Sequence, residues 1–239
     1  MVKNISVPDD YILDINYDIL LGKDWVSVLR DNLIKTDYMK NLMIFLNESY
    51  KKGGVYPSKS NIFKAIESVD FADLRVVMIG REPYNDGNAT GIPLANFDKY
   101  GKRFSDELIK YHKGIEVSIY DKFKMYQSPE LEELAGQGVL FLDAALTSTG
   151  TKLEHLVYWR NFIRQVILSI QEWIPDVVFV FMGAEAKYFA QYVKNPNYKL
   201  FCEHPYESVQ LKKPWDAEVL NEVNVVLKTM NDDDVPIVW

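Results

Sequence analysis

Apolar residues in this chain occur in two patterns, short continuous runs and longer stretches in which they are spaced. Four short runs are rich in consecutive apolar residues, and they cover residues 74–80, 138–146, 176–183 and 198–205. Strands covered on both faces show such continuous runs, whereas strands with one face in water alternate apolar and polar residues. The four runs therefore predict buried strands of a mostly parallel sheet.

The segments between these runs place apolar residues three and four positions apart, which is the spacing of helices. Residues 24–50 predict one or two helices, and Ser60 with Asn61 is a candidate cap for a short helix at 62–69. Further helices are predicted at 105–123 with a Ser cap, at 154–173 before Pro175, at 184–193 and at 214–230. Strands that alternate with helices predict an α/β fold, a central four-stranded mostly parallel sheet flanked by helices on both faces.

Composition places the chain among ordinary globular proteins. Its 239 residues, 48% of them apolar and 26% charged, suit a single domain over 1–239. Residues 1–18 lack the apolar core of a secretory signal, and no run is long enough for a membrane helix. Cys202 is the only cysteine, which excludes an internal disulfide and a cysteine-based metal site. We expect an intracellular monomer in a reducing compartment (cytoplasm or nucleus of a host), with no membrane association, no cofactor and no metal.

The net charge of −7 bears on binding partners. Nucleic-acid-binding proteins usually carry a basic surface, so this charge argues against strong non-specific affinity for DNA. It leaves room for a local basic groove on an acidic body.

Polar side chains follow each predicted strand. In open α/β sheets ligands bind at the carboxyl ends of the strands. Glu82 with Tyr84, then Asp143, Gly183 and His204 occupy those ends. Each of them taken alone fits a capping role, but together the four positions favour a binding site.

Three further features refine this picture. A carboxyl inside an apolar run, such as Asp143 in "FLDAAL", is costly to bury when ionised, so its surroundings favour the protonated form. Residues 86–104 form a long irregular segment with three glycines, which suggests a functional loop. His112 and His155 lie on helix-like segments, where a surface or capping role is expected.

Five segments of the chain, in order, resemble the motifs of family 1 uracil-DNA glycosylases. "VVMIGREPYNDGNATGI" is similar to their GQDPYH motif and its glycine-rich loop, and "CEHPYESV" stands where they have HPSPLS. Between these lie "GVLFLDAALTSTG", "HLVYW" and "VVFVFMGAEA", and "HLVYW" is closest to the poxvirus version. The resemblance covers about residues 25–239. It implies the glycosylase fold and an enzyme that flips a uracil out of DNA and hydrolyses its glycosidic bond.

The resemblance also implies roles for individual residues. Glu82 stands at the catalytic Asp, and His204 stands at the histidine that donates to the base oxygen. The implied base-binding residues are Arg81, Tyr84, Leu94 (or Phe97, if the loop shifts) and Asp143. The implied DNA-binding residues are Pro83, Gly183, Ala184, Pro205, Ser208 and Val209. The leucine that wedges into the duplex in that family has no clear counterpart, and Val209 is the candidate.

Several departures from the family fall on the chemistry. Glu82 has one methylene more than the family's Asp, and Arg81 replaces a Gln. Asn85 replaces the motif His. Asp143 replaces the Asn that reads the uracil edge, and an ionised Asp suits an amino group such as cytosine N4.

These departures leave three hypotheses open. The first is a glycosylase that acts on uracil slowly, or on cytosine or a modified pyrimidine in single- or double-stranded DNA. The second is a catalytically impaired relative that binds DNA or a protein partner as an accessory factor in replication or repair, in a viral setting if the poxvirus likeness holds. The third is an unrelated α/β hydrolase, but the chain lacks the G-x-S-x-G motif of that class.

Overall fold

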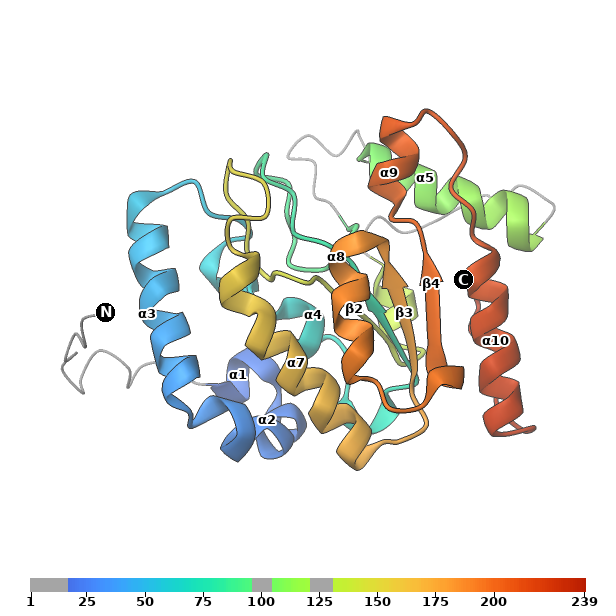
Figure 1. Ribbon diagram of the computed structural model, residues 1–239, viewed down its shortest axis with the longest axis horizontal. Coiled ribbons are helices and arrows are strands. Elements are labelled where there is room, and N and C mark those ends of the chain that lie inside the picture. The colour runs from blue at the N-terminus through green and yellow to red at the C-terminus, as the bar shows by residue number, and fades with distance from the viewer. Residues whose placement is uncertain (1–16, 96–104, 121–130) are drawn as a thin grey trace.

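Four parallel strands form the centre of the fold in the computed structural model, which describes residues 17–95, 105–120 and 131–239 (Figure 1). The strands are β1 (Val76–Ile79), β2 (Val139–Leu142), β3 (Val178–Met182) and β4 (Lys199–Cys202). Their order in the sheet is β2-β1-β3-β4, and every neighbouring pair is parallel. The predicted parallel sheet is confirmed, with strands shorter than the apolar runs that indicated them.

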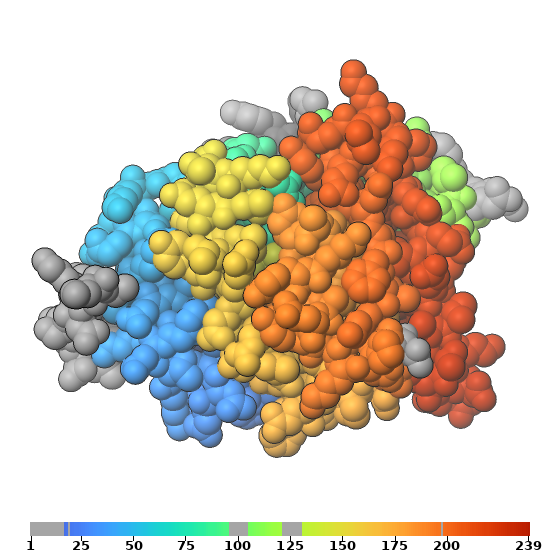
Figure 2. All heavy atoms as spheres, in the orientation of Figure 1, coloured from blue at the N-terminus to red at the C-terminus, as the bar shows by residue number. Residues whose placement is uncertain are grey.

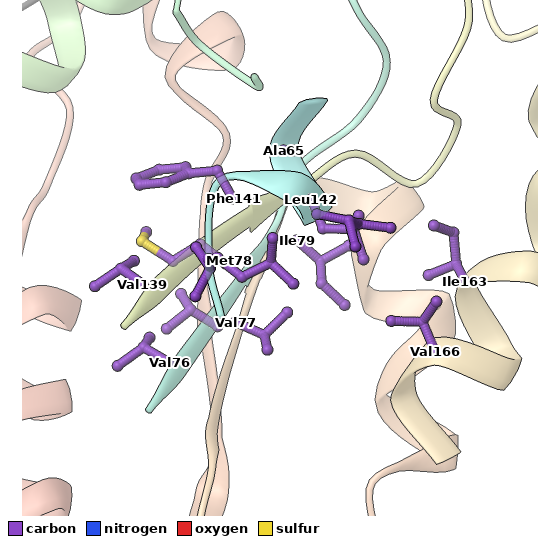
Figure 3. Close-up of a cluster of buried hydrophobic side chains, with 14 of the residues drawn as sticks. Ala65, Val76, Val77, Met78, Ile79, Val139, Phe141, Leu142, Ile163 and Val166 are labelled. Atoms are coloured by element: carbon purple, nitrogen blue, oxygen red, sulfur yellow. The ribbon is translucent and has the colours of Figure 1, made fainter. Parts of the chain in front are cut away.

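Burial explains why these runs are continuous. The residues of β1, β2 and β3 are all buried, whereas β4 lies at an edge and is partly exposed. Figure 3 shows Met78 on the side of Val139 and Phe141, while Ile79 turns toward Ile163 and Val166 of a covering helix. Both faces of β1 therefore need apolar side chains.

Helices cover both faces of the sheet, as the sequence predicts. Helix α7 (Leu156–Trp173) lies on one face, with α2 (Lys23–Leu29) and α3 (Asp37–Lys52) packed against it (Figure 1). Helices α5 (Asp106–Ile115) and α10 (Glu218–Met230) lie on the other face. The buried residues of all these elements belong to one hydrophobic core.

The ends of several elements differ from the prediction. Ser105 caps α5 as expected, because its Oγ accepts a hydrogen bond from the amide of Leu108 at 3.1 Å. Ser60 and Asn61 lie in a 3-10 turn instead and do not cap the short helix α4, which begins after Phe63. Residues 184–193 divide into α8 and a second 3-10 turn. The remaining helices are α1 (Tyr17–Leu21), α4 (Lys64–Glu67), α6 (Glu132–Ala135), α8 (Gly183–Lys187) and α9 (Pro205–Gln210), with π-helical turns at Arg30–Ile34 and Glu116–Tyr120.

Helix α9 was not predicted, although its sequence contains a start signal. Pro205 occupies the first turn, where its missing N–H is not needed, and His204 caps the helix with its ring. The segment is too short for a helical period to show, so the sequence indicated only a turn. In the part of the chain that the structure describes, no helix is long and apolar enough to span a membrane.

Candidate active site

A pocket of about 290 Å³ opens at the carboxyl ends of the strands. This volume is at the lower end of the range for small-ligand sites. Glu82, Tyr84, Asp143 and His204 all line it, so the structure brings these four predicted residues together. Residues 89–95 of the irregular loop form another wall, while Phe97 lies outside the described residues.

Gly80, which follows β1, leaves room for Asp143 after β2 and His204 after β4 to approach each other. A Cβ atom on this residue would lie 2.7 Å from Oδ1 of Asp143 and 3.5 Å from Nε2 of His204. Real Cβ atoms are not found as close to oxygen as the first of these distances, so any other residue would displace Asp143. Glycine at the end of β1 therefore permits Asp143 and His204 to face the same space.

Asp143 is a buried acid whose surroundings favour the neutral form. Its side chain is 5% exposed, and Oδ1 accepts a hydrogen bond from the backbone N–H of Arg81 at 2.9 Å. Burial raises the pKa of this carboxyl to about 8, although the Arg81 amide and guanidinium oppose the shift. This direction agrees with the expected protonated form, which offers one O–H donor beside an acceptor oxygen.

His204 is a neutral donor. Its Nδ1 accepts the backbone N–H of Tyr206 at 3.1 Å, so the proton of the neutral ring sits on Nε2. Burial, and then the positive charge of Arg81, lower the pKa of this imidazole to about 3. The ring therefore stays neutral across the physiological range and presents Nε2–H to the pocket.

Glu82 is held by the loop that follows β2. Its Oε2 accepts the backbone N–H of Leu153 at 2.9 Å. Burial raises the pKa of Glu82, while the Leu153 amide and then Arg81 lower it in part. The carboxylate is thus half-buried but has two groups that favour its ionised form.

Tyr84 and Leu94 are joined across the pocket wall. The Tyr84 hydroxyl donates to the carbonyl of Leu94 at 3.0 Å and lies 2.7 Å from Oγ of Ser105. Leu94 is buried, and its backbone φ of 64° is left-handed, an unusual conformation for a leucine. These contacts fix the aromatic ring relative to the irregular loop.

Arg81 leans away from the sheet toward α8 and α9. Its Nε donates to Oε1 of Glu185 at 3.2 Å, and its guanidinium carbon lies 4.7 Å from the centre of the Tyr206 ring. The residue is 9% exposed and lines the pocket. A contact between Arg81 and a base stays a prediction.

The predicted DNA-binding residues differ in accessibility. Ala184 is exposed and Pro83 is half-buried, whereas Gly183, Pro205 and Ser208 are buried. Ser208 is 0% exposed, so its side chain does not reach the surface. Val209 is only partly exposed. DNA contacts at these positions stay predictions.

Outside the irregular loop, sequence reasoning missed three residues that line the pocket and one exposed residue beyond it. Glu107, Lys152 and Tyr206 line the pocket from three separate segments. Leu211 is 65% exposed directly after α9. A signal for it was present in "QLKK", an apolar residue among polar ones just beyond the histidine motif.

The two other histidines, His112 and His155, do not line the pocket. His155 is 3% exposed, so the surface alternative is wrong; it stands at the N-cap position of α7, but its side chain makes no capping hydrogen bond. Its Nδ1 lies 2.8 Å from the Thr147 hydroxyl, and that hydroxyl also accepts the indole N–H of Trp159. His112 lies half-buried within α5. Among the described residues, no group of three His, Cys, Asp or Glu side chains is arranged to hold a metal ion.

Known proteins with similar sequences share one name. A uracil-DNA glycosylase of Mesomycoplasma hyopneumoniae is 31% identical over 201 residues, which cover 82% of this chain and 90% of that protein. A uracil-DNA glycosylase of Alkaliphilus oremlandii is 27% identical over 227 residues, 92% of this chain and 97% of that protein. No protein-family profile matches the chain.

Solved structures with the same fold carry that name as well. The crystal structure of mimivirus uracil-DNA glycosylase superposes with a TM-score of 0.78 at 20% identity, covering 94% of this chain and 89% of that one. The enzyme of Nitratifractor salsuginis superposes with a TM-score of 0.60 at 18% identity, covering 92% and 98%. At these identities the structural likeness concerns the fold.

Proposed function

This chain belongs to the uracil-DNA glycosylase family, and we propose that it flips a pyrimidine nucleotide out of DNA and hydrolyses the bond between base and sugar. The observation that carries the proposal is the convergence of Glu82, Tyr84, Asp143 and His204 on one pocket. Enzymes that act on a base must take it out of the stack, because the reacting atom is unreachable inside the duplex. A pocket bounded by these groups suits an extruded base.

Two residues are placed to stabilise the charges that develop as the bond between base and sugar breaks. The sugar becomes positive, and Glu82, held by the Leu153 amide, is placed to stabilise it and to orient the attacking water. The base becomes negative, and the Nε2–H of His204 is placed to donate to a base oxygen. His204 can do this as a neutral group, since its pKa is about 3.

Three residues select the base. The Tyr84 ring limits the space beside C5 of the pyrimidine, and Leu94 packs against its face. Neutral Asp143 can donate to uracil O4 and accept from N3–H. In the reverse order the same acid group matches cytosine, donating to N3 and accepting from N4. We therefore propose a base preference that is broadened from uracil toward cytosine.

A panel of oligonucleotides tests this function. Single- and double-stranded DNA containing uracil, cytosine or a 5-substituted pyrimidine is incubated with the protein and then treated with alkali, which cleaves abasic sites. Strand scission at uracil, with weaker scission at cytosine, is the expected result. Absence of scission on every substrate at enzyme excess, with DNA still bound, would instead favour a non-catalytic accessory role.

Substitution of Asp143 by Asn is expected to leave uracil excision within about threefold of wild type below pH 8, where neutral Asp143 makes the same two hydrogen bonds, and to lower cytosine excision about 10–100-fold, the range for one paired base contact. The effect depends on pH, because the raised pKa keeps Asp143 neutral below about 8. Above pH 8 the wild type should lose uracil excision about tenfold per pH unit, since ionised Asp143 repels O4. The variant should show no such loss in single-turnover rates between pH 7 and 9.5.

The matched control for this prediction is Asp233→Asn, which makes the same chemical change at an exposed residue near the C-terminus. It should leave both the rates and the pH profile unchanged. A wild-type rate on uracil that stays flat from pH 7 to 9.5 would contradict the role of Asp143.

Leu211 is the apolar side chain best placed to enter a duplex. It follows α9, the helix that also carries Tyr206 of the pocket, and it precedes Lys212 and Lys213. The orange-red region that contains α9 projects from the body of the molecule in Figure 2. Proteins that unstack bases insert an apolar wedge of this kind beside cationic residues. We therefore place the wedge at Leu211 rather than Val209.

Leu211→Ala is expected to lower excision from double-stranded DNA about tenfold and to change excision from single-stranded DNA by less than about twofold. The reason is that a wedge is needed only where a base must leave a stack. Rates on matched single- and double-stranded uracil substrates measure this. Val225→Ala, at a residue of α10 that is 66% exposed, is the control. An equal loss on both substrates would argue against a wedge.

A further inference from the structure

Two arginine–tyrosine pairs lie on the surface of the protein, outside the pocket. Arg160 and Arg164 stand one turn apart on α7. The 3-10 turn Tyr188–Tyr192, which packs against α7, supplies a tyrosine at each of its ends. The guanidinium carbon of Arg160 lies 4.9 Å from the centre of the Tyr188 ring, and that of Arg164 lies 5.6 Å from the centre of the Tyr192 ring. We call these four residues the Arg–Tyr ladder.

The arginines of the ladder have no carboxylate partner among the described residues. The ion pairs found there do not include Arg160 or Arg164, and the one side-chain acceptor is the Asn161 amide, 3.3 Å from Nη1 of Arg164. The acids on adjoining segments are bound elsewhere: Glu154 accepts from a threonine hydroxyl, and Glu185 accepts from the pocket arginine. A guanidinium keeps its N–H donors in its plane, so stacking on a ring leaves them available to a phosphate.

Further cations extend the ladder at both ends. Lys152 lines the pocket and stands four residues before α7, so the pocket end of this helix leads to the ladder. Lys187 and Lys194 are exposed before and after the 3-10 turn. Figure 2 shows the gold surface of α7 and the orange surface of residues 183–193 meeting on the face turned to the reader. On a chain with a net charge of −7, these cations form a local basic surface.

The chemistry of the ladder suits single-stranded DNA. Two guanidiniums one helical turn apart are separated by about 6 Å along the axis, which is comparable to the spacing of successive phosphates on a strand. Tyr188 is 43% exposed, so its ring can stack with a base, and only an unpaired strand presents the face of a base. We propose that the Arg–Tyr ladder is an accessory binding site for single-stranded DNA. Its arginines contact phosphates, and Tyr188 stacks with a base.

The salt dependence of binding tests the phosphate contacts. The probe is a fluorescent oligothymidylate, which contains no base that the enzyme removes. Arg160→Gln with Arg164→Gln is expected to weaken binding and to reduce the slope of log affinity against log salt concentration by about 1.4, since each phosphate contact on a single strand contributes about 0.7. An unchanged slope in this ladder variant would overturn the proposal.

The matched control removes the same charge from the other face of the sheet. Lys113→Gln with Lys228→Gln changes two exposed lysines, one on α5 and one on α10. This control should keep the wild-type affinity and salt slope, because a contact with a phosphate is local. A reduction equal to that of the ladder variant would show that only net charge matters, and it would overturn the proposal.

Stacking is tested at Tyr188. Tyr188→Ala is expected to weaken oligothymidylate binding about 5–100-fold, the range for one stacked base, whereas Tyr188→Phe keeps the ring and should bind within about twofold of wild type. A DNA duplex without uracil should bind wild type and both variants alike, because its bases are already stacked on one another. An equal loss on duplex and single strand in Tyr188→Ala would overturn the assignment to single-stranded DNA.

An acidic protein segment is the competing occupant of a basic surface. An oligoglutamate of the same charge as the oligothymidylate carries neither phosphates nor bases. Wild type should bind the DNA more tightly than this peptide, and the Arg160→Gln, Arg164→Gln variant should lose most of that difference. Loss of peptide binding with DNA binding retained would assign the surface to a protein partner and overturn the proposal. Unchanged melting temperatures show that the variants are folded. No step of these measurements involves excision, so their outcome is independent of the proposed function.

Discussion

Glu82→Gln is expected to lower the rate of base release about 10²–10⁴-fold, the range for removing a positioned acid–base group. The ionised side chain is needed twice, to stabilise the cationic sugar and to orient the water. Gln keeps the size and the hydrogen bond to the Leu153 amide, so the fold of the loop should not change. Single-turnover rates on a uracil oligonucleotide at enzyme excess measure the effect.

The pH dependence of the excision rate gives a second test of the role of Glu82. Burial raises its pKa, so the ionised form, and with it the activity, is lost on acidification at a higher pH than for an ordinary glutamate. In Glu82→Gln this acid limb should disappear from the residual rate. Glu67→Gln, at an exposed residue of α4, should keep the wild-type rate and profile. A Glu82→Gln rate within threefold of wild type would place the essential carboxylate elsewhere.

His204→Ala is expected to lower the rate about 10²–10³-fold, as for the loss of one donor to a developing oxyanion. The substitution also removes the acceptor that caps α9, since Nδ1 binds the Tyr206 amide at 3.1 Å. Loss of a cap costs about 1 kcal/mol of stability. Activity and stability must therefore be measured together, by single-turnover rates and thermal unfolding.

His204→Asn separates the two roles of the histidine. Asn is a favoured capping residue, so this variant should unfold close to the wild-type temperature. Its shorter side chain cannot place a donor where Nε2 stands, so its activity should fall as far as that of His204→Ala. An Asn variant that retains its rate within threefold would show that His204 acts only through the cap.

Local patterns predicted the sheet and its main helices well. Continuous apolar runs indicated the four strands because β1, β2 and β3 are covered on both faces. Helix α7 was clear because its buried residues recur at helical spacing up to Pro175. Helix α9 was missed because six residues are too few for a period. The surface alternative for His155 failed because nothing in its neighbourhood shows that Thr147 bonds to its ring and that Phe45 packs against it.

The sequence by itself determined which chemical groups stand at the ends of the strands: a carboxylate at Glu82, an acid in an apolar run at Asp143 and an imidazole at His204. These follow from residue type and from the strand pattern, which are local properties. Only the tertiary structure decided which of these groups carry a charge. The pKa values of about 8 for Asp143 and about 3 for His204 depend on burial by segments distant in the chain. The Arg–Tyr ladder and the exposure of Leu211 depend on packing as well, and packing is set by contacts that no local pattern records.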